Sequence, residues 1–355
     1  MPDNPQFSEW LLHHADAKNP KALARIPIAK RRIQSILDRE TVCHQKTLEQ
    51  KIAEQGPTGQ RVDPHLIGLA IRDLLEQNRL RKHQHPSTGA KPWYANPATS
   101  KEHVHERLET LAPLYDHISG HGFGNLVGDA LEVVTFKCLD RVFLANHRFA
   151  YMGQFALTEP KNAEGTYRKI QPPKALSGGI TTKEADFIQL GHNPGPLSIE
   201  CKNFREWIYP HAESLRELII KAAHQKAIPV LVARRLHYTT RTNFLEPAGI
   251  IAHESYFQYY PADKAALAAE VRHKRSLGFT DVVASEEPHP RTIKFFSEIL
   301  PRIVDEMATR WNRNKSALLE YAADEINLAQ LYTAIGSPAG GKWQDYDEAD
   351  EWEEY

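Results

Sequence analysis

Glu200 and Lys202 are the two residues whose types and spacing most directly suggest chemistry. A single residue, Cys201, separates them in the stretch SIECKNFR, Ser198–Arg205. The alternation around them predicts a strand in which Ile199 and Cys201 share one face, so that Glu200 and Lys202 share the other. One interpretation is a surface ion pair, which contributes about 0–1 kcal/mol to stability. The other is a metal-ligating carboxylate beside an ammonium group that stabilises negative charge.

Two further acids lie in elements that could bring them to this strand. Asp186 is in KEADFIQLG, a predicted strand that the turn HNPG joins to PLSIECKNFR as a hairpin. Glu132 lies in the apolar helix predicted for NLVGDALEVVTFKCLDRVF, where a glutamate usually faces water but can also face a metal. A helix, HAESLRELIIKAAHQKA, and a wholly apolar strand, IPVLVARR, follow the hairpin. The predicted order is therefore helix, strand, strand with Asp, strand with Glu-x-Lys, helix, strand.

This order of elements and acids resembles the PD-(D/E)XK, or restriction endonuclease-like, nuclease superfamily. The resemblance covers about residues 125–235 and departs from the family name only at Ala185, where the proline would stand. It implies an α/β fold with a mixed central sheet flanked by helices. It also implies an enzyme that hydrolyses phosphodiester bonds in DNA with the help of a divalent metal ion.

The resemblance also implies a role for each residue of the motif. Asp186 and Glu200 would hold Mg²⁺, for which Mn²⁺ would substitute, together with the backbone carbonyl of Cys201. Glu132 would support a second ion or orient a metal-bound water, and Lys202 would hold the attacking water or the scissile phosphate. The implied catalytic residues are thus Glu132, Asp186, Glu200 and Lys202.

Residues 26–97 are expected to form a separate small domain. Three helices are predicted for IAKRRIQSILDRE, QKTLEQKIAEQG and VDPHLIGLAIRDLLEQNRL, followed by the short strands RLRKHQH and KPWYAN. This order resembles a winged helix-turn-helix domain, in which the third helix enters the major groove of DNA and the hairpin contacts its backbone. A protein-interaction module is the alternative. The DNA contacts implied by position are His65, Arg72, Arg81, Lys82 and Lys91.

Composition sets the broad class of the protein. The chain has 355 residues, 41% of them hydrophobic and 25% charged, which predicts two domains of a soluble protein. No apolar run is long enough for a membrane span, and the first residues lack the layout of a signal peptide. Three widely separated cysteines fit the reducing cytoplasm. The net charge of −1 hides basic clusters, such as RLRKHQH and VRHKR, that are offset by the acidic DYDEADEWEEY.

The remaining segments complete the expected organisation. GHGFGN is expected to be a flexible entry to the helix that carries Glu132, and Pro301 to interrupt a helical C-terminal region. The predicted divisions are 1–25 (extension), 26–97 (winged helix), 98–124 (linker and helix), 125–260 (nuclease core), 261–336 (helical region) and 337–355 (acidic disordered tail).

Duplex DNA is the expected partner, and restriction or phage defence, with a partner protein of such a system, is the expected setting by analogy alone. A non-catalytic DNA-binding regulator on a nuclease-like fold and an RNA-directed nuclease are the alternatives. Apolar residues of the C-terminal region without an assigned partner favour a homodimer over a monomer.

Overall fold

The computed structural model describes residues 23–54, 62–88, 92–162, 165–176, 179–180, 184–237 and 239–337. The described residues form two compact units. The N-terminal unit consists of residues up to 120 together with 266–280, and the sheet unit consists of residues 121–265 and 281–337. Almost all of the predicted extension and almost all of the predicted acidic tail lie outside the described residues.

The N-terminal unit contains the expected helices and hairpin. Its helices are α4 (Ile26–Glu40), α5 (Gln45–Glu49), which continues into the π-helical turn η1 (Gln50–Glu54), and α6 (Pro64–Glu76). The hairpin strands are β2 (Arg81–His83) and β3 (Trp93–Ala95), joined through the 3₁₀ turn η3 (Pro86–Thr88). A further short strand, β1 (Val42–His44), pairs with β3, so that the antiparallel sheet has the order β1-β3-β2. Strand β1 has only three residues, which is too few for period-two alternation to predict it from the sequence.

Two segments outside 26–97 complete this unit. Helix α7 (Lys101–Ser119) begins at Ser100, whose side chain caps it by accepting a hydrogen bond from His103 N at 3.2 Å. Residues 266–280 include most of α11 (Ala265–Arg272) and the loop after it. Lys51 Nζ donates to the carbonyl oxygen of Lys274 at 3.1 Å. The compact unit therefore differs from the division at residue 97 that the sequence analysis expects.

The sheet unit is built on one mixed five-stranded sheet with the order β12-β11-β10-β9-β4. Its strands are β4 (Ala150–Met152), β9 (Phe187–Leu190), β10 (Leu197–Lys202), β11 (Ile228–Ala233) and β12 (Ile251–Glu254). β9 is antiparallel to both of its neighbours, β4 and β10, whereas β10, β11 and β12 are parallel. The expected mixed sheet is therefore present, and its first four strands follow the expected order along the chain.

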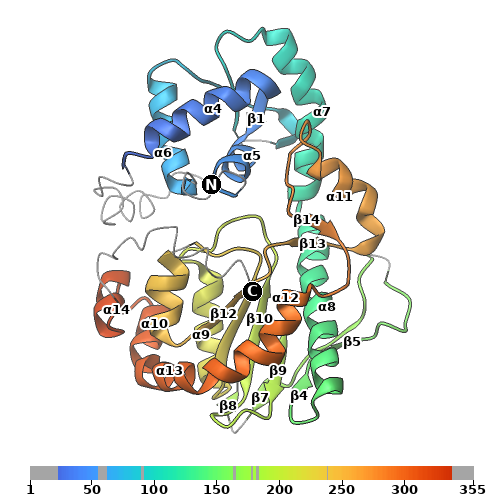
Figure 1. Cartoon of the computed structure of the whole chain (residues 1–355), viewed down its shortest axis with the longest axis vertical. Helices are drawn as coiled ribbons and strands as arrows, with labels where there is room; N and C mark the ends of the chain where they lie inside the picture. Colours follow the sequence, from blue (N-terminus) through green and yellow to red (C-terminus); the bar gives the residue numbers. More distant parts are fainter. Residues whose placement is uncertain are drawn as a thin grey trace. The chain divides into compact units, whose positions relative to one another are not determined.

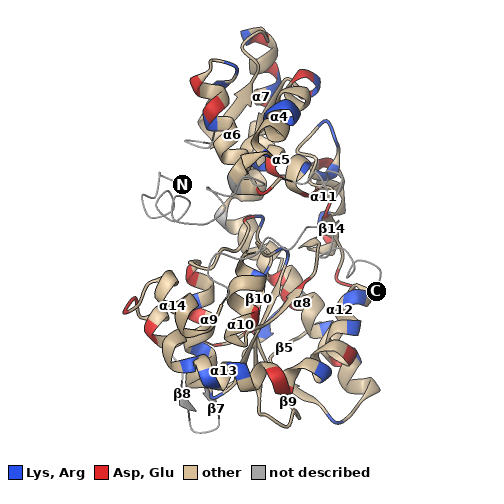
Figure 2. Ribbon diagram, turned by 60° about the vertical axis from the view of Figure 1, so that its left-hand side comes forward, with Lys and Arg blue, Asp and Glu red and all other residues tan. Residues whose placement is uncertain are grey.

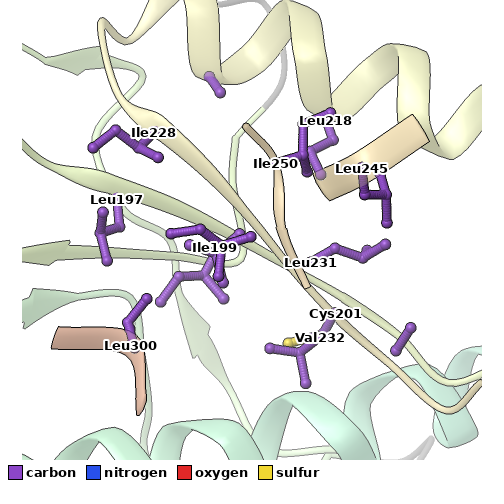
Figure 3. Packing of buried hydrophobic residues seen from close by; sticks show 14 of the residues in the cluster. Leu197, Ile199, Cys201, Leu218, Ile228, Leu231, Val232, Leu245, Ile250 and Leu300 are labelled. Carbon is purple, nitrogen blue, oxygen red and sulfur yellow. The ribbon is translucent and has the colours of Figure 1, made fainter. Parts of the chain in front are cut away.

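Helices cover this sheet (Figure 1). Helix α8 (His121–Ala145) packs against β10, where Cys201 Sγ lies 3.4 Å from Thr135 Oγ1 of the helix. Helix α9 (Glu213–His224) crosses from β10 to the parallel strand β11 and buries Leu215, Leu218 and Ile219. Figure 3 shows the apolar side chains of β10 and β11 packed in the layers between the helices. This core fixes the backbone positions of the residues that the motif predicts.

The C-terminal helices belong to the same core. After α12 (Pro290–Lys294) and the π-helical turn η6 (Phe295–Ile299) come α13 (Leu300–Ala322) and α14 (Leu328–Ala334). Pro301 lies in the first turn of α13, directly after the π-helical turn η6, so the chain stays helical through it and the expected interruption is limited to a change of helix type. Leu300, Val304 and Leu318 are buried in the core around the sheet. Most of the apolar residues that favoured a homodimer thus have partners within their own chain, whereas Ile299 is 38% exposed.

The glycine-rich stretch GHGFGN is not a flexible entry. Helix α8 begins at His121 and already contains Gly122 and Gly124. Phe123 is buried and packs edge-on against Tyr260, with 5.0 Å between the ring centroids. This burial outweighs the poor helix propensity of the glycines on either side of it.

The other elements of the sheet unit are short. They are β5 (Gln154–Phe155), β6 (Lys169–Ile170), β7 (Ala175–Leu176), β8 (Gly179–Ile180), η4 (Thr239–Leu245), α10 (Glu246–Ala248), β13 (Gln258–Tyr260), η5 (Ala262–Lys264) and β14 (Val282–Ala284). Among the described residues, no helix has the length and apolar character needed to cross a membrane.

Candidate active site

Asp186 lies immediately before β9 and is held against β10. Its backbone N–H donates to the carbonyl oxygen of Ile199 at 3.1 Å, and its Oδ2 accepts from Cys201 N at 2.7 Å. Gly153, between β4 and β5, lies against the same residue. Its φ is +94°, and a Cβ there would lie 2.5 Å from the carbonyl oxygen of Asp186. Only glycine permits this conformation and approach together, so local packing fixes the backbone at Asp186.

Lys169, at the start of β6, joins Asp186 to Glu132 of α8. Its Nζ lies 2.8 Å from Asp186 Oδ1 and 2.5 Å from Glu132 Oε2. The three side chains are between 13% and 19% exposed, so solvent screens these contacts only partly. Glu132 of the helix and Asp186 of the hairpin thus contact the same lysine, which the motif does not include.

The two acids that share Lys169 differ in pKa. Burial raises the pKa of the Asp186 carboxyl, but Lys169 and the N–H of Cys201 outweigh it and hold that pKa below its usual value. Burial and the nearby charge of Asp186 raise the pKa of Glu132 to about 8. Burial lowers the pKa of Lys169, but the two carboxylates reverse this and raise it. Asp186 is thus the firmly ionised acid of the pair.

Glu200 is bound by two other lysines. Its Oε1 accepts from Lys202 Nζ at 2.6 Å, and its Oε2 accepts from Lys221 Nζ of α9 at 2.5 Å. Lys221 Nζ also donates to the carbonyl oxygen of Glu184 at 3.3 Å. Glu200 and Lys221 are each 6% exposed, whereas Lys202 is 20% exposed. Lys202 is therefore the more accessible of the two ammonium groups.

The two groups of charges are neighbours. Burial lowers the pKa of Lys202, but Glu200 and also Asp186 raise it above its usual value. The site as a whole pairs three carboxylates with three ammonium groups. The carboxylates are Glu132, Asp186 and Glu200, and the ammonium groups belong to Lys169, Lys202 and Lys221.

The donor set fits a divalent cation in part. Glu132 and Asp186 already share one cationic group, the ammonium of Lys169, and carboxylate oxygens are the ligands that Mg²⁺ prefers. Across the described residues, however, no group of three or more His, Cys, Asp or Glu side chains is arranged to hold a metal ion. The ion shared by Asp186 and Glu200, and the ligand role of the Cys201 carbonyl, stay predictions. The Cys201 N–H is used by Asp186.

The predicted DNA contacts are described only in part. Arg72 on α6 and Arg81 and Lys82 on β2 are exposed. The side chain of His65 and the whole of Lys91 lie outside the described residues.

Two lysines of the site, Lys169 and Lys221, are missing from the sequence prediction. A signal for Lys221 exists, because it lies three residues after Leu218 and one before Ala222, on the buried side of an amphipathic helix. Lys169 follows a polar loop and lies in a strand of two residues, so no periodicity marks it.

Comparisons with known proteins provide no relative: no family model, no curated protein and no solved structure matches this chain.

Proposed function

We propose that this protein is a metal-dependent endonuclease that hydrolyses phosphodiester bonds in duplex DNA. The observation that carries the proposal is the meeting of Glu132, Asp186, Glu200 and Lys202 around one hairpin of a mixed sheet. The alternative interpretation, a surface ion pair, would involve only Glu200 and Lys202. It does not explain why acids from a helix and from a hairpin also lie in the same partly buried site. The order of α8, β4, β9, β10, α9 and β11 is also the order expected of a PD-(D/E)XK core.

Each residue has a distinct task in this proposal. Asp186 and Glu132 would hold Mg²⁺ or Mn²⁺, with Glu200 beside them. When bound, the ion would offset negative charge on the phosphate and make water a better nucleophile. Lys202, held by Glu200, stabilises the charge that develops on the phosphate oxygens. Lys221 donates to the second oxygen of Glu200 and so gives this buried carboxylate a second cationic partner.

The N-terminal unit is proposed as a winged-helix domain that binds DNA. Its basic residues extend beyond the hairpin to a separate pocket of about 790 Å³. The lining of this pocket includes five basic side chains and one acidic one, which are Arg39, Lys51, Arg107, Lys274, Arg275 and Glu40. Figure 2 shows that elsewhere Lys and Arg are mixed with Asp and Glu, for example on α13. A local excess of positive charge suits a polyanion.

Cleavage of plasmid DNA with and without Mg²⁺ tests the proposal. The purified protein should convert supercoiled plasmid to nicked or linear forms only with Mg²⁺ or Mn²⁺. Lys202→Ala should lower the rate at least about 100-fold, because electrostatic stabilisation of this kind typically contributes that much. The matched control is Lys101→Ala, an exposed lysine at the start of α7, which should cut at the wild-type rate.

The results also separate the alternatives. Wild-type protein that binds DNA but cuts neither DNA nor RNA with either metal would contradict the enzyme and favour a DNA-binding regulator. Cleavage of RNA alone would identify an RNA-directed nuclease. Cleavage by Lys202→Ala at the rate of Lys101→Ala would remove Lys202 from the mechanism.

A further inference from the structure

Three parallel strands end side by side at the edge of the sheet where Lys202 lies. The ladder of backbone hydrogen bonds continues past their ends. Arg234 N donates to the carbonyl oxygen of Lys202 at 3.0 Å, and Tyr256 N donates to the carbonyl oxygen of Arg234 at 3.1 Å. Tyr256 is therefore two strands away from Lys202, which is about 10 Å at the usual strand spacing.

Tyr256 is in contact with two guanidinium groups. Cζ of Arg235, which follows β11, lies 4.3 Å from the centre of the tyrosine ring, and Cζ of Arg291 on α12 lies 4.6 Å from it. Stacking on an aromatic ring fixes the orientation of a planar guanidinium. Tyr256 also has a φ of +62°, which is unusual for a bulky residue. Such strained residues concentrate at ligand-binding and active sites.

The charges around Tyr256 are not balanced. A third arginine, Arg241, is 49% exposed and lies 3.7 Å from Glu254. Arg235 and Arg291 form no ion pair with any described residue, and the buried Nε of Arg235 makes no hydrogen bond there. The group thus has three positive charges against one negative charge.

The neighbouring Arg234 differs from this group. Both Arg234 and Arg205 bind the buried Asp281, at 2.7 and 2.8 Å, and so have a structural partner. The excess charge therefore belongs to the side chains around Tyr256 and not to the whole edge of the sheet.

We propose that Arg235, Arg241 and Arg291, the arginine site, bind a phosphate of the nucleic-acid strand that is cut at Lys202, a few nucleotides from the scissile phosphodiester. This proposal rests on the proposed nuclease function, and it specifies a second place on the protein where the DNA substrate binds. A guanidinium presents two parallel N–H groups that match two phosphate oxygens. The separation of about 10 Å corresponds to about three nucleotides at a rise of 3.4 Å each. Tyr256 is a positioning residue that orients the guanidiniums.

The test measures DNA binding without cleavage. The full-length protein is titrated against a short fluorescent duplex in EDTA at several salt concentrations, and anisotropy gives the affinity. Arg235→Gln and Arg291→Gln should each weaken binding about 10-fold at low salt. Each should also make the log–log dependence on salt shallower by about 0.9 for each phosphate that the variant no longer neutralises. The control is Arg302→Gln, on α13, whose side chain is 76% exposed and which should match the wild type.

Tyrosine variants distinguish positioning from direct contact. Tyr256→Phe keeps the ring and should bind as the wild type does, whereas Tyr256→Leu removes the stacking surface and should lose part of the affinity. Thermal melting identifies variants that are not folded. Arg291, which is only partly buried at the start of a short helix, provides a folded variant if Arg235→Gln unfolds the protein.

The outcomes separate this site from the proposed enzyme. Folded Arg235→Gln and Arg291→Gln proteins with the affinity and salt dependence of Arg302→Gln overturn the arginine site, even if the wild type cuts DNA. Weakened binding in these variants supports the arginine site, even if the wild type fails to cut DNA with Mg²⁺.

Discussion

Lys169 is the side chain that allows two partly buried acids to face each other. Replacing it with Met leaves Glu132 and Asp186 without their shared cation. Removing one partner from such a group should lower the free energy of unfolding by about 3 kcal/mol. Mn²⁺ should then raise the melting temperature of the variant more than that of the wild type, because it supplies the missing positive charge. Thermal denaturation with and without Mn²⁺ measures both effects.

The control for this prediction is Lys161→Met. Lys161 binds Glu286 at 3.1 Å, but Glu286 keeps a second partner, Lys137, at the same distance. This variant should lose less stability and gain nothing from Mn²⁺. Equal behaviour of the two variants would show that Glu132 and Asp186 do not form a cation site.

His253 should make the stability of the protein depend on pH. Burial, together with Arg291, Arg241 and His289, lowers its pKa to about 3, from 6.5. Between these values the unfolded chain binds a proton that the folded chain does not, so stability is present above pH 6.5 and falls as the pH drops. Between pH 7 and pH 5 this histidine should remove about 2 kcal/mol from the free energy of unfolding.

Urea denaturation at the two pH values tests this expectation. His253→Gln cannot be protonated and should show a smaller loss of stability between pH 7 and pH 5 than the wild type. His105→Gln, which replaces a histidine that is 74% exposed, should leave the loss unchanged. Identical losses in all three proteins would mean that His253 is not kept neutral by the fold.

At the scale of elements, the bend between β4 and β5 supports the site. Gly153→Ala would place a Cβ 2.5 Å from the Asp186 carbonyl oxygen at a φ of +94°. Gly165 has a similar φ of +85°, but a Cβ there would meet only Leu126 Cδ2 at 3.9 Å. Gly153→Ala should therefore destabilise the protein by at least about 1 kcal/mol more than Gly165→Ala, and should slow any cleavage. Urea denaturation that shows equal losses would contradict a packing role for Gly153.

The hairpin of β2 and β3 should contribute to DNA binding through its exposed cations. Replacing both Arg81 and Lys82 with Ala should weaken duplex binding by the full-length protein. Its salt dependence should become shallower by about 1.8 on the log–log scale if each residue contacts one phosphate. The control removes Arg302 and Arg313, which are exposed on α13. Unchanged binding by the hairpin variant would point to a protein-binding winged helix.

The order of elements was predictable because it depends on local patterns. Period-two alternation identified β10 and placed Glu200 and Lys202 on one face, and the turn before it identified the hairpin with β9. Lys169 could not be predicted, because its loop brings it to Glu132 and Asp186 only through tertiary packing. Pro301 was expected to interrupt the helical region, but a π-helical turn directly before it keeps the chain helical, and the sequence pattern does not show such a local change of helix type.

At the scale of the whole molecule, the structure changes the basis for discussing assembly. Apart from the exposed Ile299, the C-terminal apolar residues that favoured a homodimer pack within the chain, so they no longer argue for one. A single site of the proposed kind aligns one water with one phosphate and so cuts one strand at a time. The form of the plasmid product, nicked or linear, therefore bears on whether two sites act together.

The N-terminal unit is discontinuous, because residues 266–280 return to it after the five strands of the central sheet. They bring Lys274 to Lys51, and Gly278 so close to Lys51 that a Cβ there would lie 2.7 Å from its Cε. Domains usually fold in order as a chain is synthesised. Here the ribosome must produce residues 121–265 before the segment that completes the first unit is available. The residues that leave the ribosome first are therefore among those that reach their final packing late.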